Sequence, residues 1–227
     1  MNNPQVNFPP SLLENITGGT LFYPCAGADF EVPVTTFAAT ISEFIFVDRG
    51  YFAPGHQDTC FTKMDGQADK ISPVMDSIKD LEFIGRSTEG PVNWDWHNRS
   101  IVPCTLTEEY LHTPTERRIF LKFTRDYGRD AFKKLNGSLA VFFYRGDSMG
   151  EGGSGDRWFS SRWFYDIITK TTTEALLVTD GSQNLHGDSG LSEIWKHANS
   201  RMSVPDPNEL IATYRPFGSF GKRFTCI

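Results

Sequence analysis

The fold of this chain is decided by residues 20–48, TLFYPCAGADFEVPVTTFAATISEFIFVD. Residues 20–24 are a short apolar run ended by a proline, and the small-residue turn at 25–29 is typical of a strand that runs into a loop. Residues 34–42 are predicted to form a short helix. Residues 43–48 are an apolar run closed by Asp48, the pattern of a buried parallel strand. Together these segments predict a β-α-β unit.

The rest of the chain alternates in the same way. Strands are expected at 117–124, 138–144 and 174–179, helices at 126–135, 158–169 and 191–198, and a closing antiparallel pair of strands at 210–214 and 222–227. Residues 49–115 have a weaker pattern, with a helix expected at 72–79 and a strand at 81–85. We interpret 49–115 as an insertion, because its hydrophobic content is too thin for an independent core. We therefore expect one α/β domain over residues 1–227, a Rossmann-like three-layer sandwich with a mostly parallel sheet and a C-terminal antiparallel strand pair.

Composition excludes several classes of protein. The 227 residues are 39% hydrophobic, without the roughly 18 to 20 uninterrupted apolar residues of a membrane span. The first ten residues lack the basic and apolar regions of a signal peptide, so we expect a cytoplasmic protein. With 22 Lys+Arg against 28 Asp+Glu, the net charge of -6 gives no bulk field to hold a nucleic acid. The cysteines form no C-x-x-C pair, which favours reduced thiols.

Polar and small residues follow the predicted strands, where ligands bind in open α/β sheets. Gly27 precedes Asp48 by about 20 residues, the separation between the glycine turn and the ribose-binding acid of nucleotide-binding units. A single glycine in the turn favours a ligand moiety without phosphate. Alternatively, Gly27 only makes a tight turn and Asp48 only caps or ends an element. The predicted cofactor-binding residues are Tyr23, Cys25, Ala26, Gly27, Asp29, Asp48, Arg145 and Gly146.

Residues 146–155 are rich in glycine and follow the strand at 138–144. Such a loop offers backbone N–H groups to a ligand, but no Gly-Lys-Ser/Thr ending is present, which excludes a Walker A loop. The stretch is either a substrate loop that carries an acid or a flexible linker. His186 follows the strand at 174–179 and has the chemistry of a general acid or base. The candidate catalytic residues are Asp147, Glu151 and His186.

Two other groups of residues have chemistry of interest. His56, Asp58 and Cys60 are metal-compatible in type, but Gly55 favours a loop, and we predict no metal site. Trp94 and Trp96 lie in a Pro/Asn-containing loop of the insertion and are expected to be partly exposed.

The order of elements resembles the class I S-adenosylmethionine-dependent methyltransferase superfamily. The resemblance rests on the first strand and turn at 21–29, on Asp48 after the second strand, and on the terminal strands at 210–214 and 222–227. It implies a seven-stranded sheet and S-adenosylmethionine bound over Gly27 with its ribose on Asp48. The family turn has the form D/E-x-G-x-G, whereas residues 23–27 have neither the leading acid nor a second glycine, which indicates a divergent member.

These observations favour a protein that binds a nucleoside-type small molecule, foremost a divergent methyltransferase of unknown acceptor. One alternative is a non-enzymatic interaction protein that uses the same fold and contacts a protein partner through residues 49–115. Another is a divalent-metal-dependent nucleotide hydrolase, because carboxylates favour hard cations. Its metal ligands would be Asp29, Asp147, Glu151 and Asp180.

Overall fold

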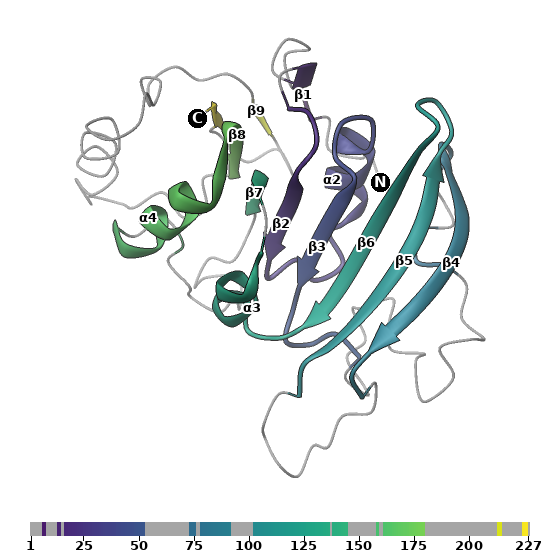
Figure 1. The fold of residues 1–227 in the computed structure, drawn as a ribbon, viewed down its shortest axis with the longest axis horizontal. Helices are drawn as coiled ribbons and strands as arrows, with labels where there is room; N and C mark the ends of the chain where they lie inside the picture. The colour runs from purple at the N-terminus through teal and green to yellow at the C-terminus, as the bar shows by residue number, and fades with distance from the viewer. Residues whose placement is uncertain are drawn as a thin grey trace. The chain divides into compact units, whose positions relative to one another are not determined.

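The structure is a computed structural model, and it describes residues 6–7, 13–14, 16–52, 73–75, 78–91, 102–136, 138–144, 158, 161–179, 213–214 and 224–226. The chain divides into two compact units. Met1–Leu21 and Gly137–Ile227 form the first unit, and Phe22–Asn136 forms the second. The division falls inside strand β2 (Thr20–Pro24). The fold is α/β, with few helices and a mixed, mostly parallel sheet (Figure 1).

The predicted β-α-β unit is present. It consists of β2, helix α2 (Glu31–Phe37) and β3 (Glu43–Val47). The arrows of β2 and β3 point the same way in Figure 1, and after β2 the Ala26 N–H donates to the carbonyl of Val47 at the end of β3. The helix begins three residues earlier than predicted and ends at Phe37. Pro33 is tolerated there because the N–H groups of a helix's first turn have no partner within the helix.

Three further strands extend the sheet of the second unit in the order β2-β3-β6-β5-β4. Strand β6 (Arg117–Arg125) runs parallel to β3, and β5 (Cys104–His112) and β4 (Leu81–Glu89) follow in antiparallel pairing. The strands predicted at 117–124 and 81–85 are confirmed. The strand at 104–112 was not predicted, and the helix predicted at 72–79 is wrong, since the described residues 73–75 and 78–80 are not helical. The described part of 49–115 therefore adds two strands to the sheet.

The core of the second unit is aromatic. Phe30, at the start of α2, packs edge-on against Phe46 and Phe123, with ring centroids 5.9 and 5.3 Å apart. All three are buried, and full burial of one phenylalanine contributes about 1.5–3 kcal/mol. Helix α3 (Gly128–Lys134), predicted at 126–135, packs Phe132 against Phe22, 5.3 Å between centroids.

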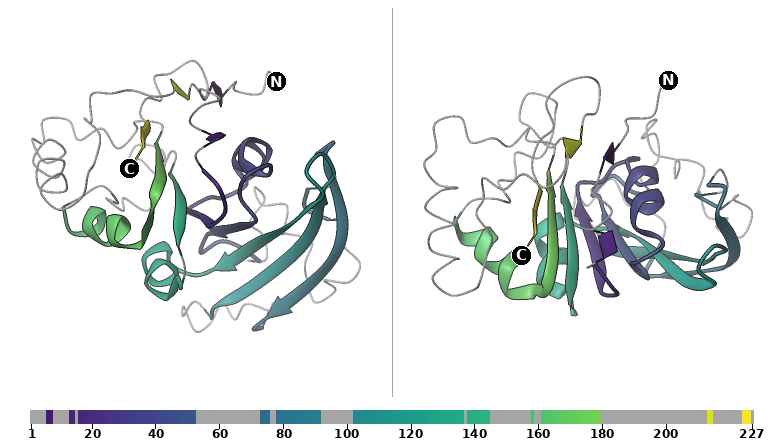
Figure 2. Two further views of the ribbon diagram at one scale, coloured as in Figure 1. Left: turned by 45° about the horizontal axis from the view of Figure 1, so that its top comes forward. Right: turned by 90° about the horizontal axis from the view of Figure 1, so that it is seen from above.

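Helices α2 and α3 lie on opposite faces of the sheet at β2. Tyr23 contacts Phe46 on the α2 side, whereas its neighbour Phe22 contacts α3, and successive side chains of a strand point to opposite faces. Figure 2 shows α2 beside β2 and β3.

Farther along the sheet, one face of β3, β6 and β5 is partly exposed and carries charged residues beside Phe120, which is 37% exposed. Lys122 bridges to Glu43 at 2.6 Å, and Arg118 bridges to Glu109 at 2.8 Å, with Arg118 68% exposed. The Arg118–Glu109 pair crosses the antiparallel strands β6 and β5, whereas the Lys122–Glu43 pair crosses the parallel strands β6 and β3. This partly exposed face and the aromatic core are the two sides of the same strands.

The first unit contains its own parallel strands. Strand β7 (Leu139–Tyr144), helix α4 (Ser161–Lys170) and β8 (Thr171–Thr179) follow one another, and β7 and β8 are parallel. The elements predicted at 138–144, 158–169 and 174–179 are confirmed with shifted ends. The Thr20 N–H donates to the Ser138 carbonyl, which aligns the start of β2 with the start of β7.

The predicted closing pair of strands is wrong. Strand β10 (Phe224–Cys226) pairs antiparallel with β8, whereas β9 (Thr213–Tyr214) pairs with β1 (Val6–Asn7). Strand β7 pairs with one edge of β8, and the N–H and carbonyl groups of the other edge need hydrogen-bond partners. Strand β10 supplies those partners and therefore does not pair with β9. The helix predicted at 191–198 lies outside the described residues.

No helix in the described part of the chain is long and apolar enough to cross a lipid bilayer.

Candidate functional site

The turn after β2 has an unusual backbone. Cys25 and Gly27 both have positive φ values, 55° and 51°. Positive φ is uncommon for a residue other than glycine, and it concentrates at functional sites. A Cβ added at Gly27 would meet no atom within 4 Å, so space is open beside this peptide. Cys25 and Gly27 are partly exposed and Ala28 is exposed.

The structure brings Gly27 and Asp48 together, as their spacing predicted. The Gly27 N–H donates to Oδ2 of Asp48 at 3.1 Å, and the Gly50 N–H donates to Oδ1 at 2.7 Å. The hydroxyl of Tyr51 donates to the Gly27 carbonyl at 2.8 Å. Residues after β3 therefore hold the N–H and the carbonyl of Gly27. We call Gly27, Asp48, Gly50 and Tyr51 the Gly27 clamp.

The other described residues predicted to bind a cofactor surround the clamp. The hydroxyl of Tyr23 donates to Oδ2 of Asp29 at 2.8 Å, and the Asp29 N–H donates to the Ala26 carbonyl at 2.9 Å. Tyr23 and Ala26 are buried, which makes them supports of the loop. Asp29 and Asp48 are partly exposed. Their carboxylates give this edge of the sheet a local negative charge.

The end of β6 adds residues that the sequence analysis missed. The buried Arg125 donates from Nε to the Val102 carbonyl at 2.8 Å and from Nη2 to the Pro91 carbonyl at 2.7 Å. Its guanidinium lies 6.0 Å from the ring centroid of Phe52, which has a φ of 64°. The Asp48 N–H donates to the carbonyl of Thr124, next to Arg125. The rule that drew attention to Asp48, a polar residue directly after a strand, selects Arg125 and Asp126 as well.

Burial affects the ionisation of Arg125 and of Cys104, which lies opposite it at the start of β5. Burial raises the pKa of the Cys104 thiol, and the nearby Arg125 offsets part of that rise. Burial lowers the pKa of the Arg125 guanidinium, and Cys104 offsets part of that fall. The Cys104 thiol is buried and donates from Sγ to the Gly90 carbonyl at 3.8 Å, and burial disfavours its reactive thiolate. Cys25, by contrast, is partly exposed.

Several predicted site residues lie outside the described residues. They are Arg145, Gly146, Asp147, Glu151 and His186, together with Asp180, His56, Asp58, Cys60, Trp94 and Trp96. Their predicted roles remain predictions. Within the described ranges, no group of three His, Cys, Asp or Glu side chains is arranged to hold a metal ion.

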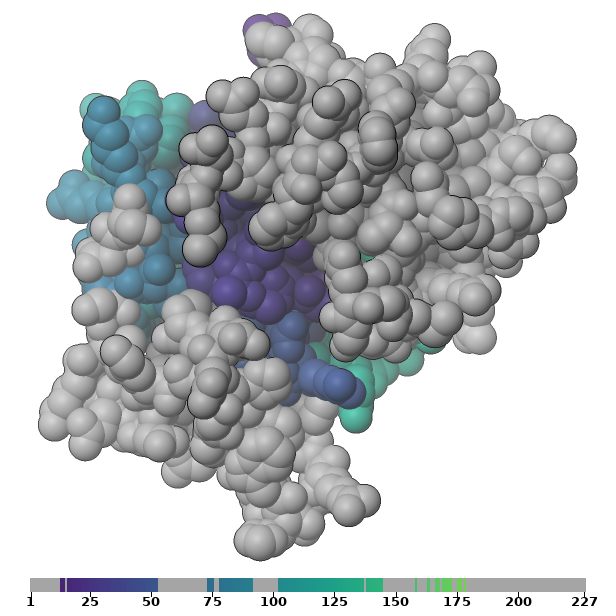
Figure 3. Space-filling model, turned by 180° about the vertical axis from the view of Figure 1, so that it is seen from behind, coloured from purple at the N-terminus to yellow at the C-terminus, as the bar shows by residue number. Residues whose placement is uncertain are grey.

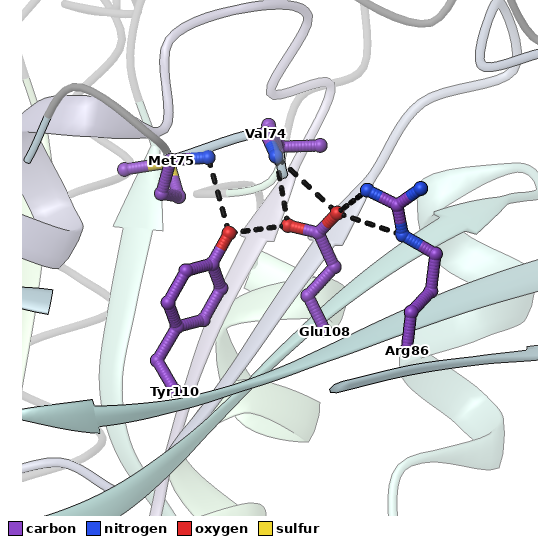
Figure 4. Close-up of polar contacts among 5 residues, drawn as sticks. All are labelled: Val74, Met75, Arg86, Glu108 and Tyr110. Carbon is purple, nitrogen blue, oxygen red and sulfur yellow. Dashed lines mark hydrogen bonds and ion pairs between the residues drawn. The ribbon is translucent and has the colours of Figure 1, made fainter. Parts of the chain in front are cut away.

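A second polar cluster lies in the β4–β5 part of the same unit (Figure 4). Glu108 is fully buried and accepts hydrogen bonds from the Val74 N–H at 3.0 and 3.2 Å and from the Tyr110 hydroxyl at 2.6 Å. Arg86 donates to it from Nε at 3.0 Å and also from Nη2. Tyr110 accepts from the Met75 N–H at 3.2 Å.

This second cluster is a structural feature. Burial and the hydrogen bond to Glu108 raise the pKa of Tyr110 well above its ordinary value, so its hydroxyl stays a donor. Both Glu108 oxygens have donors, as a buried carboxylate requires. We call Arg86, Glu108 and Tyr110 the Glu108 cluster. It holds residues 74 and 75 against the sheet.

The space-filling view in Figure 3 shows residues from the early part of the chain, in purple and indigo, at the surface. The Gly27 clamp has partly exposed members in this part of the chain.

Comparisons with protein-family models, with curated proteins and with solved structures find no match to this chain.

Proposed function

We propose that the loops after β2 and β3 bind a nucleoside-type small molecule, with S-adenosylmethionine as the foremost candidate and methyl transfer as the activity. The observation that carries this proposal is the Gly27 clamp. It fixes a glycine peptide at the carboxyl ends of parallel strands, and open space lies where a Cβ would be. A fixed peptide with free space beside it lets a flat ligand approach the backbone closely.

The charge at this edge favours a ligand without phosphate. Asp29 and Asp48 are partly exposed, and carboxylates repel a phosphate but accept hydrogen bonds from hydroxyl or ammonium groups. Of the described basic residues at these strand ends, Arg125 is buried and donates to two backbone carbonyls, whereas Arg49, next to Asp48, is exposed. S-adenosylmethionine carries a positive sulfonium and an ammonium group, so its charge suits this environment.

The strand order of the second unit supports a Rossmann-like reading. Among its parallel strands, the first along the chain is β2, the second β3 and the third β6, and they lie side by side in that order. The same order forms one half of a doubly wound nucleotide-binding sheet. Methyl transfer depends mainly on positioning of donor and acceptor, so a site with few acid or base groups is compatible with it.

Titration calorimetry with S-adenosylmethionine and S-adenosylhomocysteine tests the proposal. We expect the wild-type chain to bind at least one of them and Gly27→Ala to weaken that binding by about tenfold or more, because the methyl group fills the open space. Gly18→Ala is the matched control, since Gly18 also has a positive φ, 73°, and open space at its Cβ position. No binding to the folded wild-type chain at millimolar ligand contradicts the proposal.

A further inference from the structure

We infer that Asp48 and Tyr51 act as positioning residues that set the Gly27 peptide, and that Asp48 supports ligand binding through this peptide rather than by contact with ribose hydroxyls. The inference rests on the proposed function for its ligand, and it assigns Asp48 a role different from the one expected of an acid after the second strand. It also adds Tyr51 to the site.

The hydrogen bonds of Asp48 carry the first step. Each carboxylate oxygen accepts a backbone N–H, Oδ2 from Gly27 at 3.1 Å and Oδ1 from Gly50 at 2.7 Å. Bonds of this charge-assisted kind are stronger than bonds between neutral groups. Each oxygen keeps a second lone pair, but a ligand hydroxyl that binds there shares the oxygen with a bond that holds a loop. The carboxylate therefore already joins two loops, the turn after β2 and the turn after β3.

The hydrogen bond of Tyr51 carries the second step. Its hydroxyl donates to the Gly27 carbonyl at 2.8 Å, and its side chain is fully buried beside Phe123, with ring centroids 6.3 Å apart. Core packing thus fixes the ring, and its hydroxyl holds the Gly27 carbonyl. Gly27 is held at its N–H by Asp48 and at its carbonyl by Tyr51. Neither side chain needs to touch a ligand to fix the peptide that the ligand approaches.

The first test separates contact from positioning by changing the ligand. Adenosine and 2′,3′-dideoxyadenosine are titrated into the wild type and into Asp48→Asn. An asparagine can accept from one N–H, but its amide group opposes the other. We expect Asp48→Asn to weaken binding of both nucleosides by the same factor, about tenfold. A loss seen with adenosine but absent with the dideoxy compound overturns the inference and leaves the proposed function intact.

Tyr51→Phe is the second variant, since it removes one hydroxyl and keeps the buried ring. We expect it to weaken the binding of both nucleosides equally, by about threefold. In the double variant with Asp48→Asn its effect should be smaller than this, because both side chains hold one peptide. Tyr110→Phe is the matched control. It also removes a buried tyrosine hydroxyl that donates a hydrogen bond, to Glu108, and we expect it to leave both affinities unchanged.

A measurement without ligand keeps the positioning claim testable by itself. Amide hydrogen exchange at Gly27 is expected to become about tenfold faster in Asp48→Asn and to stay unchanged in Tyr110→Phe, because exchange reports local opening. Unchanged exchange at Gly27 in Asp48→Asn overturns the inference whatever the ligand results. If the wild type binds neither the nucleosides nor S-adenosylmethionine, the proposed function fails, and the ligand part of the inference fails with it.

Discussion

Asp48 and Glu108 each accept backbone N–H groups from a segment distant in sequence, yet their surroundings differ. Glu108 is fully buried, and its donors include the charged side chain of Arg86. Asp48 is partly exposed, and its donors are the N–H groups of Gly27 and Gly50. The same carboxylate chemistry thus closes a core in one region and holds an accessible loop in the other.

This difference predicts which carboxylate substitution lowers the stability of the chain and which one alters the candidate site. A buried carboxylate that loses its charge leaves a buried guanidinium without compensation, and this costs free energy of unfolding. A partly exposed carboxylate has water as a substitute partner, so its loss costs less stability and instead alters the geometry of the loop. The following predictions test this comparison, from the largest expected effect to the smallest.

Glu108→Gln is expected to destabilise the chain by about 3–5 kcal/mol, because Arg86 keeps its charge with its side chain only 11% exposed. Denaturant unfolding measures the effect. Glu109→Gln, on the next residue, is the control. Its partner Arg118 is 68% exposed, and surface ion pairs contribute about 0–1 kcal/mol. Equal effects of the two substitutions would contradict the structural role of the Glu108 cluster.

Gly90→Ala is expected to cost about 2 kcal/mol or more. Gly90 has a φ of 85°, and an added Cβ would lie 2.6 Å from the Pro103 carbonyl oxygen, so backbone must move in addition to the left-handed strain. Thermal unfolding measures the loss. A wild-type melting temperature in this variant would show that the β4–β5 region is less tightly packed than the contacts of Gly90 indicate.

Stability is expected to fall above about pH 10, where unfolded tyrosine ionises. The pKa of Tyr110 is raised in the folded state, so above that pH the folded chain holds a proton that the unfolded chain has lost. The sign is therefore a loss, at most about 1.4 kcal/mol per pH unit for this group. Unfolding of the wild type and of Tyr110→Phe from pH 9 upward measures it. Equal slopes for the two proteins contradict the assignment to Tyr110.

Gly27→Ala is expected to have the smallest effect on stability, about 1 kcal/mol, which is the strain of a left-handed alanine without any clash. Thermal unfolding beside Gly18→Ala is the measurement, and the two variants should agree. The effect on ligand binding, by contrast, is expected only at Gly27. A stability loss as large as that of Gly90→Ala would show that the space beside Gly27 is filled and would weaken the site proposal.

The regular strands were predictable because their signal is local. The run 139–144 is buried along its length, as its residue types predict. The strand at 43–47 is also present, but it is not fully buried as predicted, because Glu43 and Ile45 are partly exposed. Strand β5 was missed because its buried face carries Glu108 and His112 among the apolar residues, which breaks the hydrophobic alternation. Glu108 is acceptable there because Arg86, opposite it in the register of β4, donates to it together with the Val74 N–H and the Tyr110 hydroxyl.

The candidate site was predictable in part. The spacing of Gly27 and Asp48 placed them at neighbouring strand ends, but it did not tell whether Asp48 faces a ligand or the backbone. Tyr51 and Arg125 carried weaker signals, since an aromatic residue in a turn and a basic residue at a strand end are common. Their roles depend on contacts across 24 and 34 residues, to the Gly27 and Pro91 carbonyls.

The sequence by itself determined the β-α-β unit, the buried strands and the neighbouring positions of Gly27 and Asp48. Hydrophobic periodicity and short connections act over a few residues, and they can be read one segment at a time. The tertiary structure decided which partners satisfy each polar group: the Gly27 N–H for Asp48, Arg86 for Glu108, and β8 for β10. Those partners are distant in sequence, and strand register, which depends on the whole sheet, brings them together.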